Sequence, residues 1–239
     1  VVATMSSGKS TLINALLGKK LMPAAQTATT ATIVRIVSAE QDYFSAIAYD
    51  KSGNVVKQID DVTLEIMQNL NDDLSISTIE ILGRIPFVKT AGMKLVLIDT
   101  PGPNNSRDEN HREMTERMIQ NSDNSLVLYI MNGQQLGIND DKILLDSICQ
   151  EMGKKGKKSR ERFLFVMNKM DSFDPSSDND GPGCIERELE KSRIRLDEQG
   201  IHNPNIFPVC SLPILQQRAN LKGLQARELR GYKEFLEEY

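Results

Sequence analysis

The residues best suited to chemistry stand at the start of the chain. Gly8, Lys9 and Ser10 follow a short apolar stretch and precede residues with helical spacing. A loop between a strand and a helix presents backbone N–H groups and the positive end of the helix dipole to phosphate. Because Gly-Lys-Ser can also begin an ordinary helix, this interpretation depends on motifs further along the chain. The residues that we expect to contact a nucleotide here are Met5, Ser6, Ser7, Gly8, Lys9, Ser10 and Thr11.

Two side chains of this phosphate loop have distinct expected roles. Lys9 would place its ammonium group on the β- and γ-phosphates, and Ser10 would place its hydroxyl on Mg²⁺. Ala3 stands where such loops usually carry a first glycine. Its methyl group is tolerated if the backbone there has a negative φ, so we expect that conformation.

The segment after Pro23 is rich in threonine and small residues, and we call residues 24–32 the threonine loop. A hydroxyl from this loop would complete the Mg²⁺ shell and sense the γ-phosphate. We predict Thr30 for this role, with Thr29 as the alternative. A run of threonines also favours the strand that follows it, so that explanation stays open for each of them.

A second switch element follows a buried-strand pattern that ends in Asp99. Asp99 would bind Mg²⁺ through a water molecule. The N–H of Gly102 would contact the γ-phosphate, so hydrolysis would release the loop after it. Asp-x-x-Gly alone is a common turn, and its position after a strand and downstream of a phosphate loop makes it specific.

The tetrapeptide Asn168-Lys169-Met170-Asp171 follows another apolar strand pattern and predicts the choice of base. Asp171 would accept hydrogen bonds from the ring N–H and the exocyclic amine of guanine, a donor pair that adenine lacks. A buried polar site rejects the wrong base because the carboxylate would then be unpaired. The stem of Lys169 would lie along the base plane, and Asn168 would tie this loop to the phosphate loop.

A last strand pattern ends in Cys210 and Ser211. Their backbone N–H groups would meet the carbonyl oxygen of guanine. This signal is weak by itself and is accepted because it falls where a fifth element of the site belongs.

Apolar runs alternate with helical patterns, which predicts an α/β fold with a mainly parallel sheet flanked by helices. With the phosphate loop, this becomes a three-layer sandwich of the P-loop NTPase class. The expected strands are residues 32–37, 43–49, 55–59, 78–85, 94–99, 125–131, 162–168 and 205–210. The expected helices are residues 10–17, 62–70, 107–121, 139–152, 185–199 and 212–239.

The order of these elements indicates one domain spanning residues 1–239. Ser52-Gly53-Asn54 between two short strands predicts a hairpin turn. We therefore expect residues 40–93 to elaborate this domain between the two switch regions. Residues 212–239 would begin a C-terminal helical element. Since the chain opens on a strand and closes inside a helical pattern, we expect a domain cut from a longer protein at both ends.

The composition limits the classes of partner and the compartment that we expect for this chain. The chain has 239 residues and a formal net charge of −4, so no general attraction to nucleic acid is expected. Three cysteines without paired spacing favour a reducing, cytoplasmic compartment. No apolar run approaches the roughly 20 residues that a membrane span needs.

Together the motifs resemble those of bacterial dynamin-like GTPases. The similarity is carried by residues 6–18, by Leu21-Met22-Pro23, by the threonine loop, and by residues 98–103 and 168–171. It implies binding of GTP and GDP, Mg²⁺-dependent GTP hydrolysis and dimerisation through the GTPase faces. It also implies self-assembly through helical stalks outside this sequence, and peripheral association with a lipid membrane.

The resemblance assigns catalytic roles to Ser6, Lys9 and Thr30. A serine matching Ser6 helps to hold the attacking water and a charge-compensating monovalent cation, although a small residue for a tight loop explains it equally well. Met5 replaces the glutamine of many dynamins, which leaves the cation arrangement open. Two arginines in the segment after Gly102 are interpreted as solvated helix charges rather than arginine fingers, and these are Arg107 and Arg112.

Two other functions compete with this one. The first is a monomeric regulatory or assembly GTPase that acts through an RNA or protein partner. It is disfavoured by the acidic net charge and by the long stretch between the switch regions. The second is a GTP-dependent dimerisation switch with negligible hydrolysis.

Overall fold

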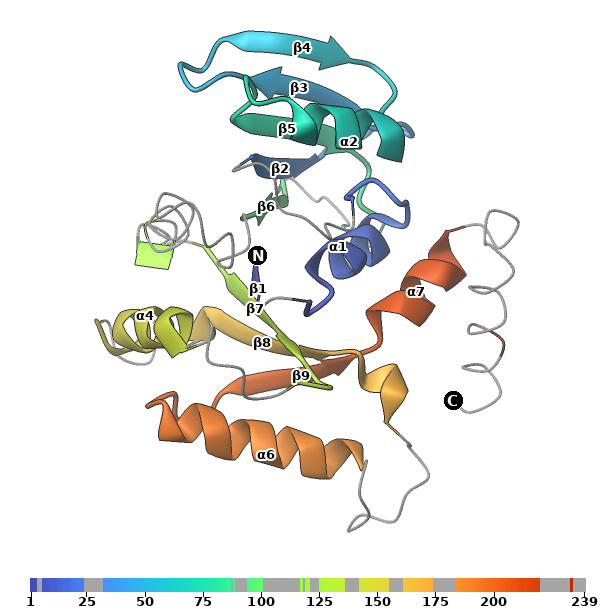
Figure 1. The fold of residues 1–239 in the computed structure, drawn as a ribbon. Coiled ribbons are helices and arrows are strands. Elements are labelled where there is room, and N and C mark those ends of the chain that lie inside the picture. The colour runs from blue at the N-terminus through green and yellow to red at the C-terminus, as the bar shows by residue number, and fades with distance from the viewer. Residues whose placement is uncertain are drawn as a thin grey trace.

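The structure is a computed structural model, and Figure 1 shows its strands following one another from β4 at the top to β9 near the bottom. The fold is α/β, with helices on the faces of the strands, as expected from the sequence. The structure describes residues 1–3, 6–23, 32–86, 88, 94–100, 117, 119–120, 125–135, 142–154, 161–173, 184–219 and 233.

One part of the fold is a four-stranded sheet in the order β1-β7-β8-β9, in which all neighbours are parallel. Its strands are β1 (Val2–Ala3), β7 (Val127–Asn132), β8 (Phe163–Asn168) and β9 (Asn205–Val209). The carboxyl ends of parallel strands meet at one edge of a sheet, so the residues after β1, β7, β8 and β9 are brought together there.

The other sheet has five strands in the order β4-β3-β5-β2-β6. Its strands are β2 (Ile33–Ser38), β3 (Ser45–Tyr49), β4 (Val55–Ile59), β5 (Thr78–Gly83) and β6 (Val96–Asp99). Only β2 and β5 pair in parallel, whereas β2–β6, β3–β4 and β3–β5 are antiparallel. The expected parallel pairing is therefore confirmed for the four-stranded sheet, and the five-stranded sheet is mixed.

Backbone hydrogen bonds join the two sheets at β6 and the start of β1. The nitrogen of Val1 donates to the carbonyl of Ile98 at 2.6 Å. The N–H of Thr100 donates to the carbonyl of Val1 at 3.4 Å, and the Thr100 hydroxyl donates to the same oxygen at 3.0 Å. This is the pattern of a parallel pair, and it places the end of β6 beside the phosphate loop.

Helices cover both faces of the four-stranded sheet (Figure 1). On one face, α4 (Lys142–Lys154) and α6 (Ile185–Glu198) pack with Tyr129 and Phe165 in a common apolar cluster. On the other face, Leu12 of α1 (Lys9–Leu17) packs with Ile130 and Val166. The two packed faces account for the expected three layers. A short 3-10 helix, η2 (Met170–Ser172), and a further helix, α7 (Ser211–Arg218), follow β8 and β9.

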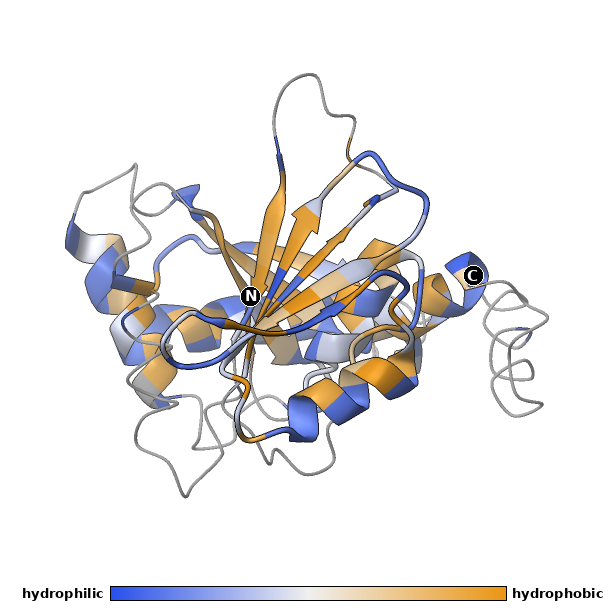
Figure 2. Cartoon of the chain, turned by 90° about the horizontal axis from the view of Figure 1, so that it is seen from above, coloured by the Kyte–Doolittle hydropathy of each residue, from blue (hydrophilic) through white to orange (hydrophobic). Residues whose placement is uncertain are grey.

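The five-stranded sheet has its own core. Alternating residues of β2, β3 and β5 are buried, and they pack with α1 and with α2 (Leu64–Asp72). In Figure 2 the strands near the centre are largely orange, and the helices around them carry both orange and blue residues. The alternation along the strands is what one buried face and one more exposed face require.

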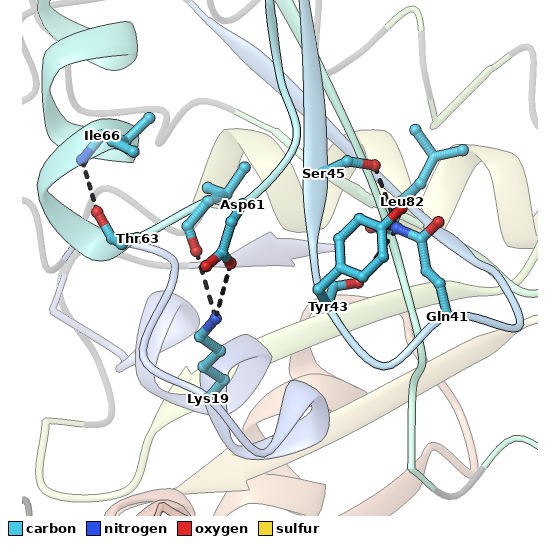
Figure 3. Close-up of polar contacts among 9 residues, drawn as sticks. Lys19, Gln41, Tyr43, Ser45, Asp61, Thr63, Ile66 and Leu82 are labelled. Atoms are coloured by element: carbon cyan, nitrogen blue, oxygen red, sulfur yellow. Dashed lines mark hydrogen bonds and ion pairs between the residues drawn. The ribbon is translucent and has the colours of Figure 1, made fainter.

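Local chemistry explains several boundaries. The predicted hairpin is confirmed, since Gly53 has a φ of 82° and the carboxylate of Asp50 accepts from the N–H groups of Ser52 and Asn54 at 2.8 Å each. Thr63 caps α2 by accepting from the N–H of Ile66 at 3.3 Å (Figure 3).

The expected helices agree with the structure to within a few residues in its described part, except that the expected helix 212–239 is interrupted at Ala219, where the backbone is extended. The expected helix 107–121 is described only at residues 117, 119 and 120, which are helical. Of the expected helix 212–239, α7 covers the start and ends at Arg218, and most of the chain after Arg218 lies outside the described residues. Among the helices of the described part, none is long and apolar enough to cross a membrane.

Candidate nucleotide site

The phosphate loop turns through two left-handed residues before α1 begins. Ser6 has a φ of 54°, and Gly8, the N-cap of α1, has a φ of 84°. A Cβ atom at Gly8 would lie 2.5 Å from the amide nitrogen of Asn168. Glycine is therefore required at this position both for its backbone conformation and for the close approach of Asn168. Ala3 lies in β1 and is absent from the positive-φ residues, as expected.

Asn168 joins three parts of the site. Its side-chain amide donates to the carbonyl of Ser7 at 2.8 Å. Its side-chain oxygen accepts from the N–H of Ser211 at 3.1 Å and from the Ser211 hydroxyl at 2.6 Å. The side chain is buried, at 2% exposed. The loop after β8 and the loop after β9 are thus fastened to the phosphate loop, which is the tie expected of Asn168.

Lys9 and Asp99 form a partly buried ion pair. Their nitrogen and oxygen lie 2.8 Å apart, and the Lys9 ammonium also donates to the carbonyl of Thr100. Ser10 and Thr11 follow Lys9 in the first turn of α1. The ammonium, the carboxylate and the first turn of the helix are therefore brought together at the end of β6 and the start of α1.

The tetrapeptide expected to select the base, residues 168–171, forms a tight turn at the end of β8. Lys169 has a φ of 66° and precedes η2, which contains Asp171. The Ser172 hydroxyl donates to the Lys169 carbonyl at 2.6 Å, and Met170 is buried. These contacts hold Asp171 at the same edge of the sheet as the phosphate loop.

Cys210 is partly buried and lies close enough to Asp171 for the negative charge of Asp171 to raise the pKa of the Cys210 thiol. Burial, followed by the negative charge of Asp171, raises the pKa of the Cys210 thiol to about 11. The residue expected to face the base and the residue expected to select it therefore share one environment.

The sequence interpretation missed Asn132. Its side-chain amide lies 3.4 Å from the Ser6 carbonyl, and its oxygen accepts from the N–H of Gln134 at 3.1 Å. Asn132 pairs in register with Asn168, so the two neighbouring strands β7 and β8 both end in an asparagine directed at the phosphate loop. The sequence did hold a signal for Asn132, because two successive apolar strand patterns each end in an asparagine.

Three predicted site residues lie outside the described part of the chain: Met5, Thr30 and Gly102. The alternative Thr29 also lies outside it. The remaining predicted residues follow β1 and β9, end or follow β8, or lie in the first turn of α1, and Asp99 at the end of β6 contacts Lys9 among them. Within the described residues, the Ser7 hydroxyl is buried and has no hydrogen-bond partner. A buried hydroxyl beside the backbone N–H groups of a helix start suits a phosphate ligand, so the residues fit a nucleotide.

Comparison with known proteins supplies the family. The sequence model of the dynamin family matches residues 1–170. The chain belongs to the dynamin family. Membership implies a GTPase domain that binds GTP, and it agrees with the motifs from which the resemblance was inferred. A search among curated proteins gave no match.

Solved structures show the same fold at low sequence identity. Two similar chains come from an oligomerised bacterial dynamin pair described as sensing and tethering membranes over a long range. The first has a TM-score of 0.64 at 18% identity, covering 98% of this chain and 36% of that one. The second has a TM-score of 0.54 at 15% identity, covering 100% of this chain and 33% of that one. This chain thus spans about a third of the length of each.

Proposed function

We propose that this domain binds GTP with Mg²⁺ and hydrolyses it, as the GTPase part of a larger dynamin-like protein. The observation that carries the proposal is the position of Asn168, which fastens the base-selecting turn and Ser211 to the phosphate loop. A nucleotide that spans these elements has its base and its phosphates held by one rigid unit.

Each residue has a role in that site. Lys9 binds the β- and γ-phosphates, Ser10 and Asp99 hold the metal, and the N–H groups of the phosphate loop bind the phosphate oxygens. When bound, Mg²⁺ neutralises the charge that develops between the β- and γ-phosphates. Beyond the described residues, Thr30 and Gly102 are proposed to face the γ-phosphate.

Ser6 is proposed to orient the attacking water. Its left-handed backbone and the neighbouring Asn132 amide turn its carbonyl toward β7. A monovalent cation that Ser6 would help to hold near the β–γ bridge is a candidate cofactor, as the resemblance implies.

Asp171 is proposed to select guanine, and this gives the sharpest test of binding. Xanthine carries a carbonyl oxygen where guanine carries its exocyclic amine, so Asp171→Asn offers it a matching donor. We expect the unaltered chain to bind GTP at least a hundredfold tighter than ATP. Asp171→Asn should lose GTP affinity and gain affinity for xanthosine triphosphate. Titration calorimetry measures both affinities. If Asp171→Asn weakened the binding of GTP and of xanthosine triphosphate equally, that result would count against a base-selecting role.

Residues 1–239 are proposed to form one domain. In it β3, β4, α2 and β5 extend the sheet beyond β2, as the elaboration between the switch regions. Residues 212–239 begin the connection to a helical stalk.

Coupling to self-assembly and to membranes is proposed from the family and from the described activity of the structural relatives. We expect the hydrolysis rate per molecule to rise with protein concentration, because dimerisation through the GTPase faces would complete the site. A rate that stays flat from nanomolar to high micromolar protein, including full-length protein with lipid vesicles, would remove this part of the proposal.

A further inference from the structure

Asn14 is a buried polar residue in the interior of α1. It lies four residues after Ser10, about 6 Å further along the helix axis, and only 5% of it is exposed. Asparagine is unfavourable in a helix interior, and a buried carboxamide needs partners. The partners of Asn14 therefore indicate why the residue is there.

Three hydrogen bonds join the Asn14 side chain to backbone groups of one short segment beyond the helix. Its side-chain oxygen accepts from the N–H of Leu21 at 2.8 Å and from the N–H of Met22 at 2.7 Å. Its side-chain nitrogen donates to the carbonyl of Met22 at 2.8 Å. Leu21 and Met22 are themselves buried, at 0% and 4% exposed. The carboxamide thus fixes this segment from its inner side.

The fixed segment leads directly into the threonine loop, because only Pro23 separates Met22 from residue 24. The same helix carries Lys9 and Ser10 in its first turn. One helix therefore determines both where Ser10 lies and where Leu21 and Met22, the residues shortly before the threonine loop, lie.

We propose that Asn14 is a positioning residue for the threonine loop. It holds Leu21 and Met22, which lead into the loop, at a fixed place relative to Ser10, and the proposed function assigns a hydroxyl of that loop to the same Mg²⁺ that Ser10 binds. The inference rests on the proposed function. It concerns the coupling between Mg²⁺ and the loop, and not the binding of the nucleotide itself.

The test measures nucleotide binding and its dependence on Mg²⁺ separately. The affinity for a fluorescent non-hydrolysable GTP analogue is measured in EDTA and then over a range of Mg²⁺ concentrations. Asn14→Asp keeps an acceptor for Leu21 and Met22 but removes the donor to the Met22 carbonyl and adds a charge beside it. Asn14→Leu removes all three hydrogen bonds.

We expect Asn14→Asp to bind the analogue in EDTA within about twofold of the unaltered chain, because the phosphate loop is intact. The Mg²⁺ concentration for half-maximal binding should rise about tenfold, and Asn14→Leu should show a larger shift. Hydrolysis of GTP at saturating nucleotide should fall in the same order, with little change in KM.

Lys19→Ala is the matched control. Lys19 also follows α1, and it reaches the carbonyl of Val62 at 3.4 Å and the carboxylate of Asp61 at 3.8 Å (Figure 3). It ties the end of α1 to the segment before α2. Its removal should leave the Mg²⁺ dependence unchanged.

Three results would overturn the inference. An equal loss of affinity in EDTA and in Mg²⁺, or loss of the fold in both Asn14 variants, would assign Asn14 to stability alone. The third is an unchanged Mg²⁺ dependence in both variants. Failure of the unaltered chain to bind the analogue would instead refute the proposed function, so the two failures are distinguishable.

Discussion

The ammonium of Lys9 lies 2.8 Å from a carboxylate oxygen of Asp99, at the junction between the two sheets. Both side chains are mostly buried, at 16% and 11% exposed. In the proposed site these two groups have different partners, since Lys9 binds phosphate and Asp99 holds Mg²⁺. In that site, binding of GTP with Mg²⁺ separates the Lys9–Asp99 ion pair, and the free energy needed to separate it opposes binding.

Because the two groups form an ion pair, substitutions of Lys9 and Asp99 should affect GTP affinity differently when Mg²⁺ is removed. Asp99→Asn should leave GTP affinity in EDTA unchanged or raise it, because the Lys9 ammonium is then released to the phosphates. The additional affinity that Mg²⁺ provides should fall about tenfold, or about 1.4 kcal/mol. Lys9→Ala should lose affinity in both conditions. Equal weakening by the two substitutions in EDTA would contradict the competition between phosphate and Asp99.

Asn168 should be important for stability as well as for nucleotide binding. Asn168→Ala removes hydrogen bonds to the Ser7 carbonyl and to the N–H and hydroxyl of Ser211. Since the groups left behind are buried, we expect the free energy of unfolding to fall by about 2–4 kcal/mol. Ser211→Ala, the control, removes only the hydroxyl and should lower it by about 1 kcal/mol. Chemical denaturation would measure both, and equal losses would contradict the bridging role.

Gly83 should tolerate no larger residue while Phe44 is present. A Cβ at Gly83 would lie 2.2 Å from a ring carbon of Phe44, and Phe44 is buried. We expect Gly83→Ala to destabilise the domain by about 1–3 kcal/mol through overpacking. Combined with Phe44→Leu, the same substitution should be less harmful, and a double-mutant cycle measures the difference. Strictly additive losses would show that the ring is not the obstacle.

Cys210 should be an unreactive thiol below alkaline pH. With its pKa raised to about 11 by burial and by the Asp171 charge, only about one thiol in a thousand is ionised at pH 8. In a variant with Cys149→Ser and Cys184→Ser, alkylation should accelerate about tenfold per pH unit up to pH 10. Asp171→Asn should speed the reaction at pH 8, because it removes the charge that disfavours the thiolate. A rate that levels off near pH 9 would contradict the raised pKa.

Most elements and many of the site contacts followed from local patterns. Alternating burial along β2, β3 and β5 and the glycine turn at Gly53 are properties of neighbouring residues, so the sequence alone indicates them. The tie from Asn168 to the phosphate loop followed from the order of the motifs.

The remaining features depend on contacts that form only when the chain folds. Asn14 looks like an unfavourable helix residue until Met22 is folded against it. The antiparallel pairing of β3 with β5 and of β6 with β2 is set by contacts between strands, and no local pattern specifies it. The Lys9–Asp99 pair also forms only when β6 is placed beside β1.

Single-turnover hydrolysis with the concentrated domain in excess over nucleotide tests the central claim most directly. With Mg²⁺ present, we predict conversion of GTP to GDP, with ATP turned over at least a hundredfold more slowly. Lys9→Ala should abolish the reaction. Comparable hydrolysis of ATP, or no GDP formed from GTP at protein concentrations high enough for self-association, would contradict the account of this domain as a GTPase.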